Sequence, residues 1–446
     1  MLDQPEFGQR LKHLRIQRGM SQAALADGFL STSYLSRLES GARPPTRRIV
    51  KQLAARLEVA ESDFGDASPD TAALATLVAV AASSGTDPVA ASGDDAGGVD
   101  DVVPGAPPLG TPAGDAPASA GAARGVAEEL AAALESDGAD PALRWQALWL
   151  LAHTRRAQRQ AGEELRLFTE TVELADGLDV PELRVRARSE LARTLAAAGD
   201  LAGARRAAEQ AFALSDEGVG TRDRLAALHA LVAAEVESGR LAEAREHVDE
   251  LGRTAADCGT VERVKAQWAA AAVRTRQADY AGARQLLESA LNELESWVDL
   301  VLWLRLRLAA ASLYLQAAEP LIGPARARLA EAERAVDLVG SALHRDQLRA
   351  LQARLAYAEG RYAEARELAG RDEEPLRRLS FRDGIRLQSL RAQLRMRAGE
   401  VEPGTLALQE LARQAQEALN VDLAAEIWRD LAWTVAALHA APERAA

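Results

Sequence analysis

The sequence predicts an all-α protein with more than one domain. The chain has 446 residues, and single cores rarely grow beyond about 250–300 residues. Apolar residues make up 48% of the chain but aromatic residues only 4%. Alanine and leucine dominate, with arginine and glutamate around them, and these residues lose little side-chain freedom in a helix. The clusters of valine, isoleucine and aromatic residues that are typical of strands hardly occur.

The net charge of −13 is divided unevenly along the chain. Residues 1–56 hold ten Lys/Arg and four Asp/Glu, a balance of +6. Residues 57–123 hold eleven acidic residues and no basic one, and the remainder has a balance of −8. Positive charge confined to the first segment predicts a nucleic-acid-binding domain there, because the rest of the chain would repel DNA.

Three regions follow from these patterns. Residues 1–65 show short helical patterns separated by turn signals. Residues 66–123 are a low-complexity acidic linker of Ala, Gly, Asp, Pro and Ser, which predicts a disordered tether with a possible helix over 71–82. Residues 124–446 are repetitive, and we expect them to form a separate repeat domain.

The first region opens with two short helices. Phe7, Leu11 and Leu14 form one apolar stripe of a first helix, which Gly19 ends. Ser21 is a suitable N-cap for the second helix. We expect Leu25 to be the core residue of that second helix.

A third helix follows a short turn. Ser31 or Thr32 can cap it, and Gly41 ends it after Ser40. We expect two of its residues to point inward and four to form one polar face at spacing i, i+3, i+4 and i+7: Leu35 and Leu38 inside, and Ser33, Ser36, Arg37 and Ser40 outside. Short hydroxyl side chains allow close approach to a DNA groove, and arginine can read guanine with two hydrogen bonds.

The segment resembles the XRE (lambda-repressor-like) helix-turn-helix family through RLKHLRIQRGMSQAALA and SYLSRLESGARPPT, over nearly all of residues 5–65. The resemblance implies a five-helix domain that binds double-stranded DNA. It also implies that Gln22 holds a phosphate, that the start of the third helix reads bases, and that the following loop contacts the DNA backbone. The implied DNA-binding residues are Gln22, Thr32, Ser33, Tyr34, Ser36, Arg37, Ser40 and Arg43.

The last region repeats at a period of about 40 residues. Its clearest copies are GDLAGARRAAEQA from Gly199, GRLAEAREHVDEL from Gly239, ADYAGARQLLESA from Ala278 and GRYAEARELAG from Gly360. Each unit predicts two amphipathic helices, with a small residue in the second helix where neighbours approach closely (Ala204, Ala244, Ala283 and Ala365). One such pair cannot bury its apolar faces alone, so neighbouring pairs must stack into a superhelix.

These units resemble the tetratricopeptide repeat, with about seven copies over roughly 320 residues. HEAT or armadillo repeats are the structural alternative. The tetratricopeptide resemblance implies that the first helix of each unit lines a concave surface. The outward-facing positions expected there are candidate ligand-binding residues: Arg186, Arg193, His229, Lys265, Trp268, Gln347, Arg354, Tyr357, Arg386 and Gln393.

An XRE domain joined to such repeats resembles the peptide-responsive quorum-sensing regulators of bacteria. The resemblance implies a homodimer that senses a peptide or another small-molecule ligand. Two alternatives remain open. The repeats could be a protein-interaction scaffold that recruits a protein partner to DNA, or they could only dimerise a constitutive repressor.

Other chemistry has no support in the sequence. Phosphate-binding, dinucleotide-binding and zinc-protease motifs do not occur, the six histidines are scattered, and Cys258 is the only cysteine. We therefore expect no catalytic residues, no metal site and no cofactor. The longest apolar run, Ala72 to Ala82, is too short to cross a membrane, and no signal peptide is indicated, which predicts a cytoplasmic protein.

Overall fold

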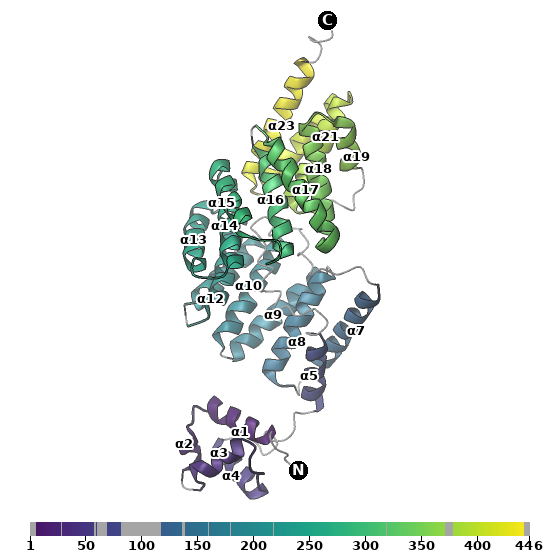
Figure 1. Cartoon of the computed structure of the whole chain (residues 1–446). Coiled ribbons are helices and arrows are strands. Elements are labelled where there is room, and N and C mark those ends of the chain that lie inside the picture. The colour runs from purple at the N-terminus through teal and green to yellow at the C-terminus, as the bar shows by residue number, and fades with distance from the viewer. Residues whose placement is uncertain are drawn as a thin grey trace. The chain divides into compact units, whose positions relative to one another are not determined.

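The computed structural model of the chain describes residues 6–27, 29–57, 59, 69–81, 117–135, 139–158, 160–178, 180–216, 218–317, 319–370 and 378–440. Every regular element in these ranges is a helix, and no β-strand occurs in them (Figure 1). The prediction of an all-α fold is confirmed. The chain divides into two compact units, one formed by residues 1–78 and 130–144 and the other by residues 79–129 and 145–446.

The first unit contains the helix-turn-helix segment. Its helices are α1 (Glu6–Gln17), α2 (Gln22–Ala26), α3 (Thr32–Glu39) and α4 (Arg47–Leu57). Ser21 accepts a hydrogen bond from the backbone N–H of Ala24 at 3.0 Å, and Ser31 accepts one from Tyr34 at 3.1 Å. Both predicted N-caps are therefore confirmed.

The core of this segment contains the apolar residues predicted from the sequence, together with one face of α4. Leu11, Leu25 and Leu35 are completely buried. The core residues are Phe7, Leu11, Leu14, Leu25, Ala26, Leu35, Leu38, Val50, Leu53, Ala54 and Leu57. All four helices contribute to this core, so a small set of aliphatic side chains holds α3 in place.

Helix α5 (Pro69–Ala81) corresponds to the helix expected over 71–82. It is the fifth helix among the described residues. Its Thr71 Oγ1 accepts a hydrogen bond from the backbone N–H of Asp140 at 3.2 Å. Helix α7 (Pro117–Leu134) begins inside the segment expected to be a tether. The rest of that expectation, over residues 66–68 and 82–116, lies outside the described residues.

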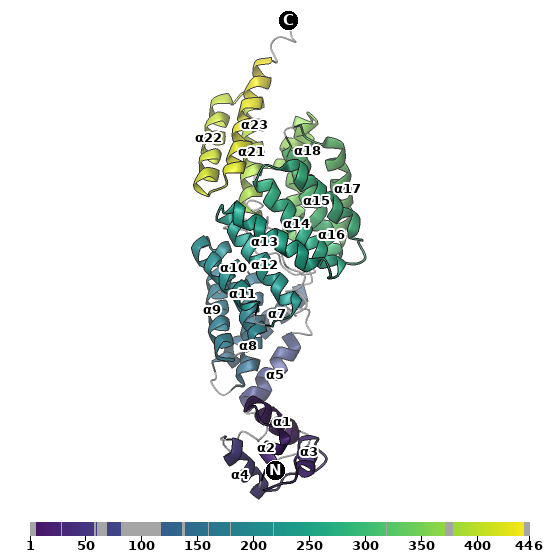
Figure 2. The same cartoon turned by 90° about the vertical axis from the view of Figure 1, so that its left-hand side faces the viewer.

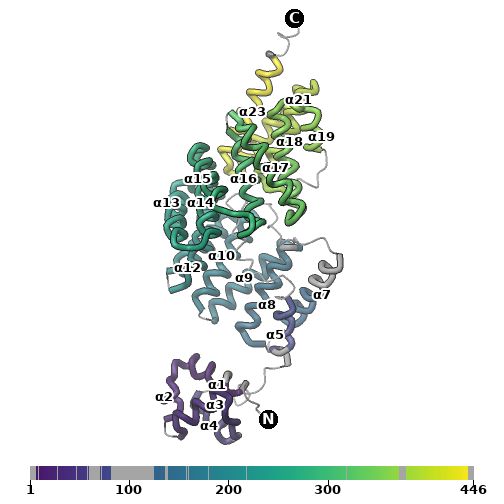
Figure 3. The backbone as a smooth tube through the Cα atoms, viewed as in Figure 1, coloured from purple at the N-terminus to yellow at the C-terminus, as the bar shows by residue number. Residues whose placement is uncertain are grey.

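The second unit contains seven described helix pairs and a final helix, which follow one another along the chain (Figures 1 and 3). The pairs and the final helix are α8 (Pro141–Ala157) and α9 (Ala161–Leu178), α10 (Pro181–Ala197) and α11 (Leu201–Leu214), α12 (Thr221–Glu237) and α13 (Leu241–Ala255), α14 (Thr260–Arg276) and α15 (Tyr280–Glu293), α16 (Leu300–Gln316) and α17 (Ile322–Val339), α18 (Ala342–Ala358) and α19 (Tyr362–Ala369), α21 (Phe381–Arg397) and α22 (Val401–Glu417), and α23 (Val421–Ala440). Figure 2 shows α21, α22 and α23 lying side by side at the end of this series.

The first and second helices of a pair differ in burial. Helix α16 has twelve buried residues, whereas its partner α17 has five, all on one face. A helix that is buried on all sides lies between other layers, and a helix with one buried stripe covers the outside. We call the first helix of each pair the inner helix.

The turn between the two helices of a unit is built in the same way in several copies. The residue two before the second helix has positive φ, as at Gly199 (86°), Gly239 (71°) and Gly360 (77°). Such a backbone conformation favours glycine. Asp200 and Asp279 then cap their helices by accepting hydrogen bonds from the backbone N–H groups of the residues three positions later.

The small residues predicted at close helix approaches are confirmed in the packing. Ala204, Ala244, Ala283 and Ala365 are each completely buried. A larger side chain at any of these positions would force the two helices of the pair apart, because protein interiors are close-packed.

Candidate DNA interface and ligand groove

Helix α3 presents one polar face to solvent. All the hydroxyl and arginine side chains predicted for this face are exposed: Thr32, Ser33, Ser36, Arg37 and Ser40. The opposite face buries Leu35 and Leu38 completely. The helix therefore has the amphipathic form that a helix needs to be held by a core on one side and to enter a DNA groove on the other.

A buried ion pair fixes the end of α3. The Glu39 carboxylate is 7% exposed and accepts hydrogen bonds from Nε of Arg15 at 2.6 Å and from Nη2 of Arg15 at 3.0 Å. The hydrogen bond with Glu39 raises the pKa of Arg15. This two-point contact joins α1 to the C-terminal end of α3, and such bidentate pairs set orientation as well as energy.

Gln22, the predicted phosphate-binding residue, belongs to the same network. Its Nε2 donates to Oε2 of Glu39 at 2.7 Å. An amide nitrogen carries two N–H groups, so this bond orients the amide and uses only one of them. The role of Gln22 in holding a phosphate remains a prediction.

The two remaining predicted residues, one inside α3 and one in the loop after it, lie together. The guanidinium of Arg43 stacks over the ring of Tyr34, 4.4 Å from its centroid. Tyr34 is partly buried against the core of the segment, whereas Arg43 is exposed. The stack restrains an arginine beside the exposed face of α3.

Sequence reasoning missed the residues that hold this interface together. Arg15 and Glu39 are 24 positions apart, and nothing in their local pattern pairs them. Gly8 was also missed. A Cβ atom at Gly8 would lie 2.3 Å from the carbonyl oxygen of Leu38, so α1 crosses α3 at the one point where only glycine fits.

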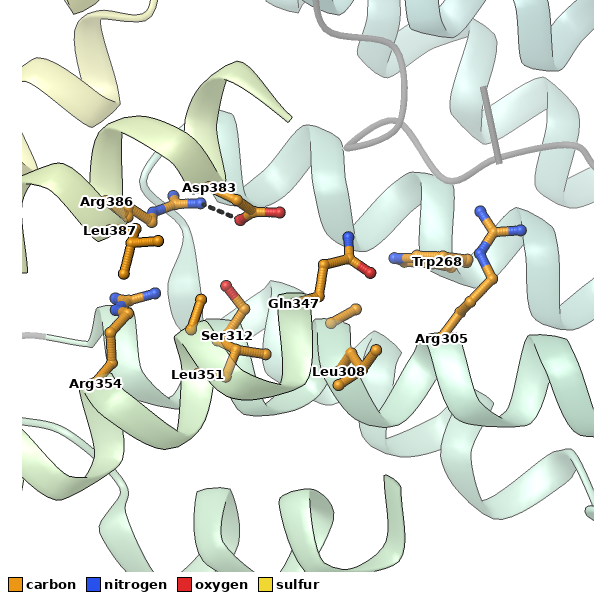
Figure 4. A pocket seen from close by; sticks show the side chains of 12 residues that line it. Trp268, Arg305, Leu308, Ser312, Gln347, Leu351, Arg354, Asp383, Arg386 and Leu387 are labelled. Carbon is orange, nitrogen blue, oxygen red and sulfur yellow. Dashed lines mark ion pairs between the residues drawn. The ribbon is translucent and has the colours of Figure 1, made fainter. Parts of the chain in front are cut away.

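In the second unit, four inner helices line a groove (Figure 4). Trp268 of α14, Gln347 and Arg354 of α18, and Arg386 of α21 all contribute to it, so the structure brings four predicted ligand-binding residues together. Figure 4 shows Trp268 at one end, Arg354 and Arg386 at the other, and Gln347 between them.

Further side chains in this groove were not singled out from the sequence. The guanidinium of Arg305 lies 4.9 Å from the ring centroid of Trp268. Asp383 pairs with Nη1 of Arg386 at 3.7 Å. Leu308 and Leu351 supply apolar surface to the same lining. The signal that could have found Arg305 is its register, one repeat after Lys265.

A second hollow lies beside the groove and includes two more predicted residues, Tyr357 and Gln393. Nε of Arg397 donates to the Tyr357 hydroxyl at 3.0 Å. Nε2 of Gln393 donates to Oδ2 of Asp430 at 3.2 Å. The aromatic rings of Tyr362 and Trp433 also line this hollow, which therefore combines aromatic and charged groups.

Helix α23 supplies the acids that meet the predicted cations. Asp422, Glu426 and Asp430 follow one another at four-residue spacing and so share one face of the helix. Glu426 is 3.3 Å from Nη2 of Arg354 and 3.2 Å from Nη2 of Arg386. Arg354 and Arg386 were predicted to bind a ligand. In the structure both of them pair with Glu426 of α23.

Helix α23 and the residue before it also contact a helix that is distant in sequence. Arg276 of α14 donates to Oδ1 of Asn420 at 3.0 Å and lies 3.4 Å from Asp422. Arg382 of α21 donates to the same Asn420 oxygen at 2.7 Å. Repeats in an extended solenoid contact only their neighbours. The contact between α14 of the fourth pair and α23 therefore shows that the superhelix winds tightly enough to bring distant helices together.

The expectation that all the candidate ligand residues face outward is wrong for several of them. Lys265, Trp268, Arg386 and Gln393 are only 3–8% exposed. The physical reason is the packing of the inner helices against one another, to which α23 adds contacts with Arg386 and Gln393. Whether these residues bind a ligand remains a prediction.

The last predicted residues lie on earlier repeats. Arg186 and Arg193 of α10 line a small pocket with residues of α8 and α12. His229 of α12 is partly buried, and burial together with the nearby charges of Lys265 and Arg193 lowers its pKa to about 3. His229 is therefore neutral at physiological pH.

Comparison with known proteins agrees with the geometry of the first four helices. Residues 6–64 match the helix-turn-helix domain family. The chain has a helix-turn-helix domain. No curated protein sequence matches the chain.

Two solved structures are similar to the chain. The crystal structure of Bacillus thuringiensis PlcR in complex with the peptide PapR7 and DNA has 13% sequence identity and a TM-score of 0.40, covering 69% of this chain and 98% of PlcR. A tetratricopeptide repeat protein from Parabacteroides merdae has 16% identity and a TM-score of 0.39, covering 58% of this chain and 89% of the other.

None of the helices in the described residues is both long and apolar enough to cross a membrane. Within the same ranges, no group of three or more His, Cys, Asp or Glu side chains could hold a metal ion.

Proposed function

We propose that the chain is a transcription regulator that binds a specific DNA sequence through α3. The observation that carries this proposal is the exposed face of Thr32, Ser33, Ser36 and Arg37 on a helix whose other face is buried. The balance of +6 over residues 1–56 supports it, because positive charge attracts the DNA backbone. We expect the protein to act in the cytoplasm and not to be an enzyme.

Arg37→Ala tests the proposed interface. The operator would first be selected from random duplex DNA with the full chain, and affinity would then be measured by fluorescence anisotropy at fixed salt. Loss of a bidentate contact to a base should cost about 1–3 kcal/mol, roughly 10–100-fold in affinity. Arg205→Ala on α11 is the matched control, since this arginine belongs to the repeats, and it should bind normally. Equal operator affinity of the Arg37 variant and the wild type would contradict the assignment of α3.

We further propose that the repeat unit senses a peptide or small molecule in the groove of Figure 4. The groove combines an indole, an amide and arginines with apolar side chains, which suits a peptide with apolar and acidic groups. Backbone amide hydrogen exchange of the full chain would be compared with and without fractions of culture extract. A fraction that contains the ligand should slow exchange in α14, α16, α18 and α21 together.

Trp268→Ala should abolish that protection, because Trp268 is a large apolar contact inside the groove. Trp297→Ala is the matched control, since Trp297 is 83% exposed in the turn before α16. Protection that survives the Trp268 substitution would place the ligand elsewhere on the chain.

A second candidate function is association through the last helix. Val421 and Trp428 are exposed apolar residues on α23, which has no following helix among the described residues. Exposed apolar side chains that lie together mark interaction sites, and we propose that a second copy of the chain covers this face in a homodimer. Sedimentation velocity would compare the oligomeric state of the wild type with that of Trp428→Gln. The wild type should sediment as a dimer, and the variant should shift toward the monomer. A stoichiometric foreign protein on purification would instead favour the scaffold function.

A further inference from the structure

A row of polar pairs joins α21 to α23, which lie side by side (Figure 2). Nη2 of Arg382 pairs with Asp422 at 2.5 Å, and Nη2 of Arg386 pairs with Glu426 at 3.2 Å. In both pairs the acid lies 40 positions after the arginine. Because the separation is equal, the two helices run in the same direction, and later residues of α21 should also face residues about 40 positions ahead.

Arg397 lies about three helical turns after Arg386 and so shares its face of α21. The residue 40 positions further on, by the separation of the earlier pairs, is Ala437, whose side chain accepts no hydrogen bond. Nε of Arg397 donates to the Tyr357 hydroxyl at 3.0 Å. In the part of the chain that the structure describes, no carboxylate pairs with this guanidinium and neither Nη atom meets an acceptor. The side chain is partly exposed, and neither Nη atom is enclosed by protein.

Two aromatic rings hold the Arg397 guanidinium in one orientation. It lies 5.3 Å from the ring centroid of Tyr357 and 4.3 Å from that of Tyr362. The two rings pack against each other with their centroids 5.3 Å apart. An arginine that is stacked and hydrogen-bonded in this way loses less freedom when its remaining N–H groups bind a ligand.

This guanidinium lines the second hollow, beside the groove of Figure 4, together with Ala437. The hollow has a free volume of about 310 Å³, which is at the lower end of the range for small-molecule sites. Leu315, Leu390 and Trp433, which is 47% exposed, give it apolar surface. The hollow therefore has room for an apolar or aromatic body beside the accessible end of Arg397.

The charged groups of the lining favour an anion. Four arginines and two acids line the hollow: Arg354, Arg386, Arg397, Arg429, Glu426 and Asp430. Glu426 pairs with both Arg354 and Arg386, and Asp430 lies 4.0 Å from Arg429. Among the described residues, Arg397 is therefore the arginine of this lining that no acid neutralises.

We propose that the second hollow binds a small molecule with a carboxylate on an apolar or aromatic body, and that Nη1 and Nη2 of Arg397 hold the carboxylate. A carboxylate accepts two parallel hydrogen bonds from a guanidinium. The ligand's acid takes the place that Asp422 and Glu426 have in the earlier pairs of the row. The inference goes beyond the proposed function, because this ligand binds beside the groove of Figure 4 and not in it.

The test is a titration of the full chain with phenylacetate, followed by saturation-transfer NMR of the probe. Phenylacetamide is the control compound, because it keeps the ring and loses the charge. Phenylacetate should bind saturably, and phenylacetamide should bind at least about tenfold more weakly, since a hydrogen bond to a charged group is the stronger kind. Equal affinity of the two compounds, or no saturable binding of phenylacetate, would overturn the proposal.

Arg397→Gln should weaken phenylacetate binding roughly 10–100-fold, because it removes the charged donor. Arg395→Gln is the matched control. Arg395 lies on the same helix, is exposed and pairs with Glu400 at 2.9 Å, and it does not line the hollow. The control should bind phenylacetate like the wild type.

Ala437→Glu tests the same site without removing the arginine or its ring contacts. The substitution places an acid 40 positions after Arg397, at an exposed residue of the hollow's lining. The new carboxylate should pair with Arg397 and weaken phenylacetate binding at least about tenfold, with no loss of thermal stability. Ala436→Glu is the matched control, since Ala436 is exposed and lies outside the lining.

Unchanged phenylacetate affinity in both Arg397→Gln and Ala437→Glu would overturn the proposal, as would an equal loss in Ala436→Glu. The groove ligand is measured separately through Trp268, and DNA binding through Arg37. Failure of the carboxylate site is therefore distinguishable from failure of the proposed function.

Discussion

At the scale of single residues, the helix-turn-helix domain depends on one close contact and one buried pair. Gly8 lets α1 touch the backbone at the end of α3, and Arg15 holds Glu39 at the same place. Neither residue faces solvent at the proposed DNA surface. Both nevertheless decide where Ser36 and Arg37 point, because they set the crossing of α1 and α3.

Gly8→Ala should therefore weaken both folding and DNA binding. The new methyl group would lie within 3 Å of two carbonyl oxygens, those of Leu38 and Glu39, and backbone must shift to admit it. We expect a loss of about 1–3 kcal/mol in the unfolding free energy of this domain, measured by urea denaturation, together with weaker operator binding.

Gly252→Ala is the matched control for this substitution. Gly252 lies inside α13, where nothing stands within 4 Å of the added methyl group. Replacing a helical glycine by alanine there should stabilise by about 0.5–1 kcal/mol. If Gly8→Ala were also neutral or stabilising, the close approach of α1 and α3 would be wrong.

At the scale of elements, the turns between helices share one backbone geometry but differ in backbone strain. Most copies place glycine where φ is positive, but Ala278 has φ 61° and Leu419 has φ 58°. Non-glycine residues adopt this conformation at a cost of about 1 kcal/mol. The two strained turns precede α15 and α23, so the chain retains the turn geometry even where the sequence does not favour it.

Reciprocal substitutions test this reading of the turns. Ala278→Gly should raise the unfolding free energy of the repeats by up to about 1 kcal/mol, because it relieves strain at positive φ. Gly239→Ala should lower it by a similar or larger amount, since Gly239 has φ 71°. Thermal unfolding of the two variants and the wild type ranks their stability. A change in unfolding free energy of the same sign for both substitutions would rule out a common turn.

At the scale of the whole repeat unit, α23 ties distant repeats together through charge. Its acidic face meets arginines from α14, α18 and α21, and the most distant in sequence is Arg276, which pairs with Asp422. Buried pairs of this kind are costly to break, because removing one partner leaves a buried charge. Arg354 and Arg386 belong both to the lining of the groove and to these pairs, so a displacement of α23 would also alter the groove.

Asp430 gives this closure a pH dependence. Burial, with a further contribution from Glu426, raises the pKa of Asp430 to about 7. Its unfolded value is near 3.9, so the folded chain binds the extra proton between these two values. The unfolding free energy should fall as pH rises from about 4 to about 7 and then level off, a change on the order of 4 kcal/mol.

Asp430→Asn should remove that component of the pH dependence. The variant would equal or exceed the wild type in stability at pH 8, and its advantage would shrink toward pH 5. Urea denaturation at three pH values measures the difference between the two proteins, which cancels the contribution of all other groups. A constant difference across this range would show that Asp430 does not titrate there.

The sequence by itself determined the features that depend on local chemistry. The caps at Ser21 and Ser31, the helix ends at Gly19 and Gly41 and the apolar stripes each depend on residues within one or two helical turns, and the helix-turn-helix domain follows from them. The period of the repeats is visible directly in the sequence. Only the tertiary structure decided which cations are neutralised. Arg354 meets Glu426 across 72 residues and Arg15 meets Glu39 across 24. Such pairing depends on how helices cross and how tightly the superhelix closes, and neither leaves a periodic signal in the chain.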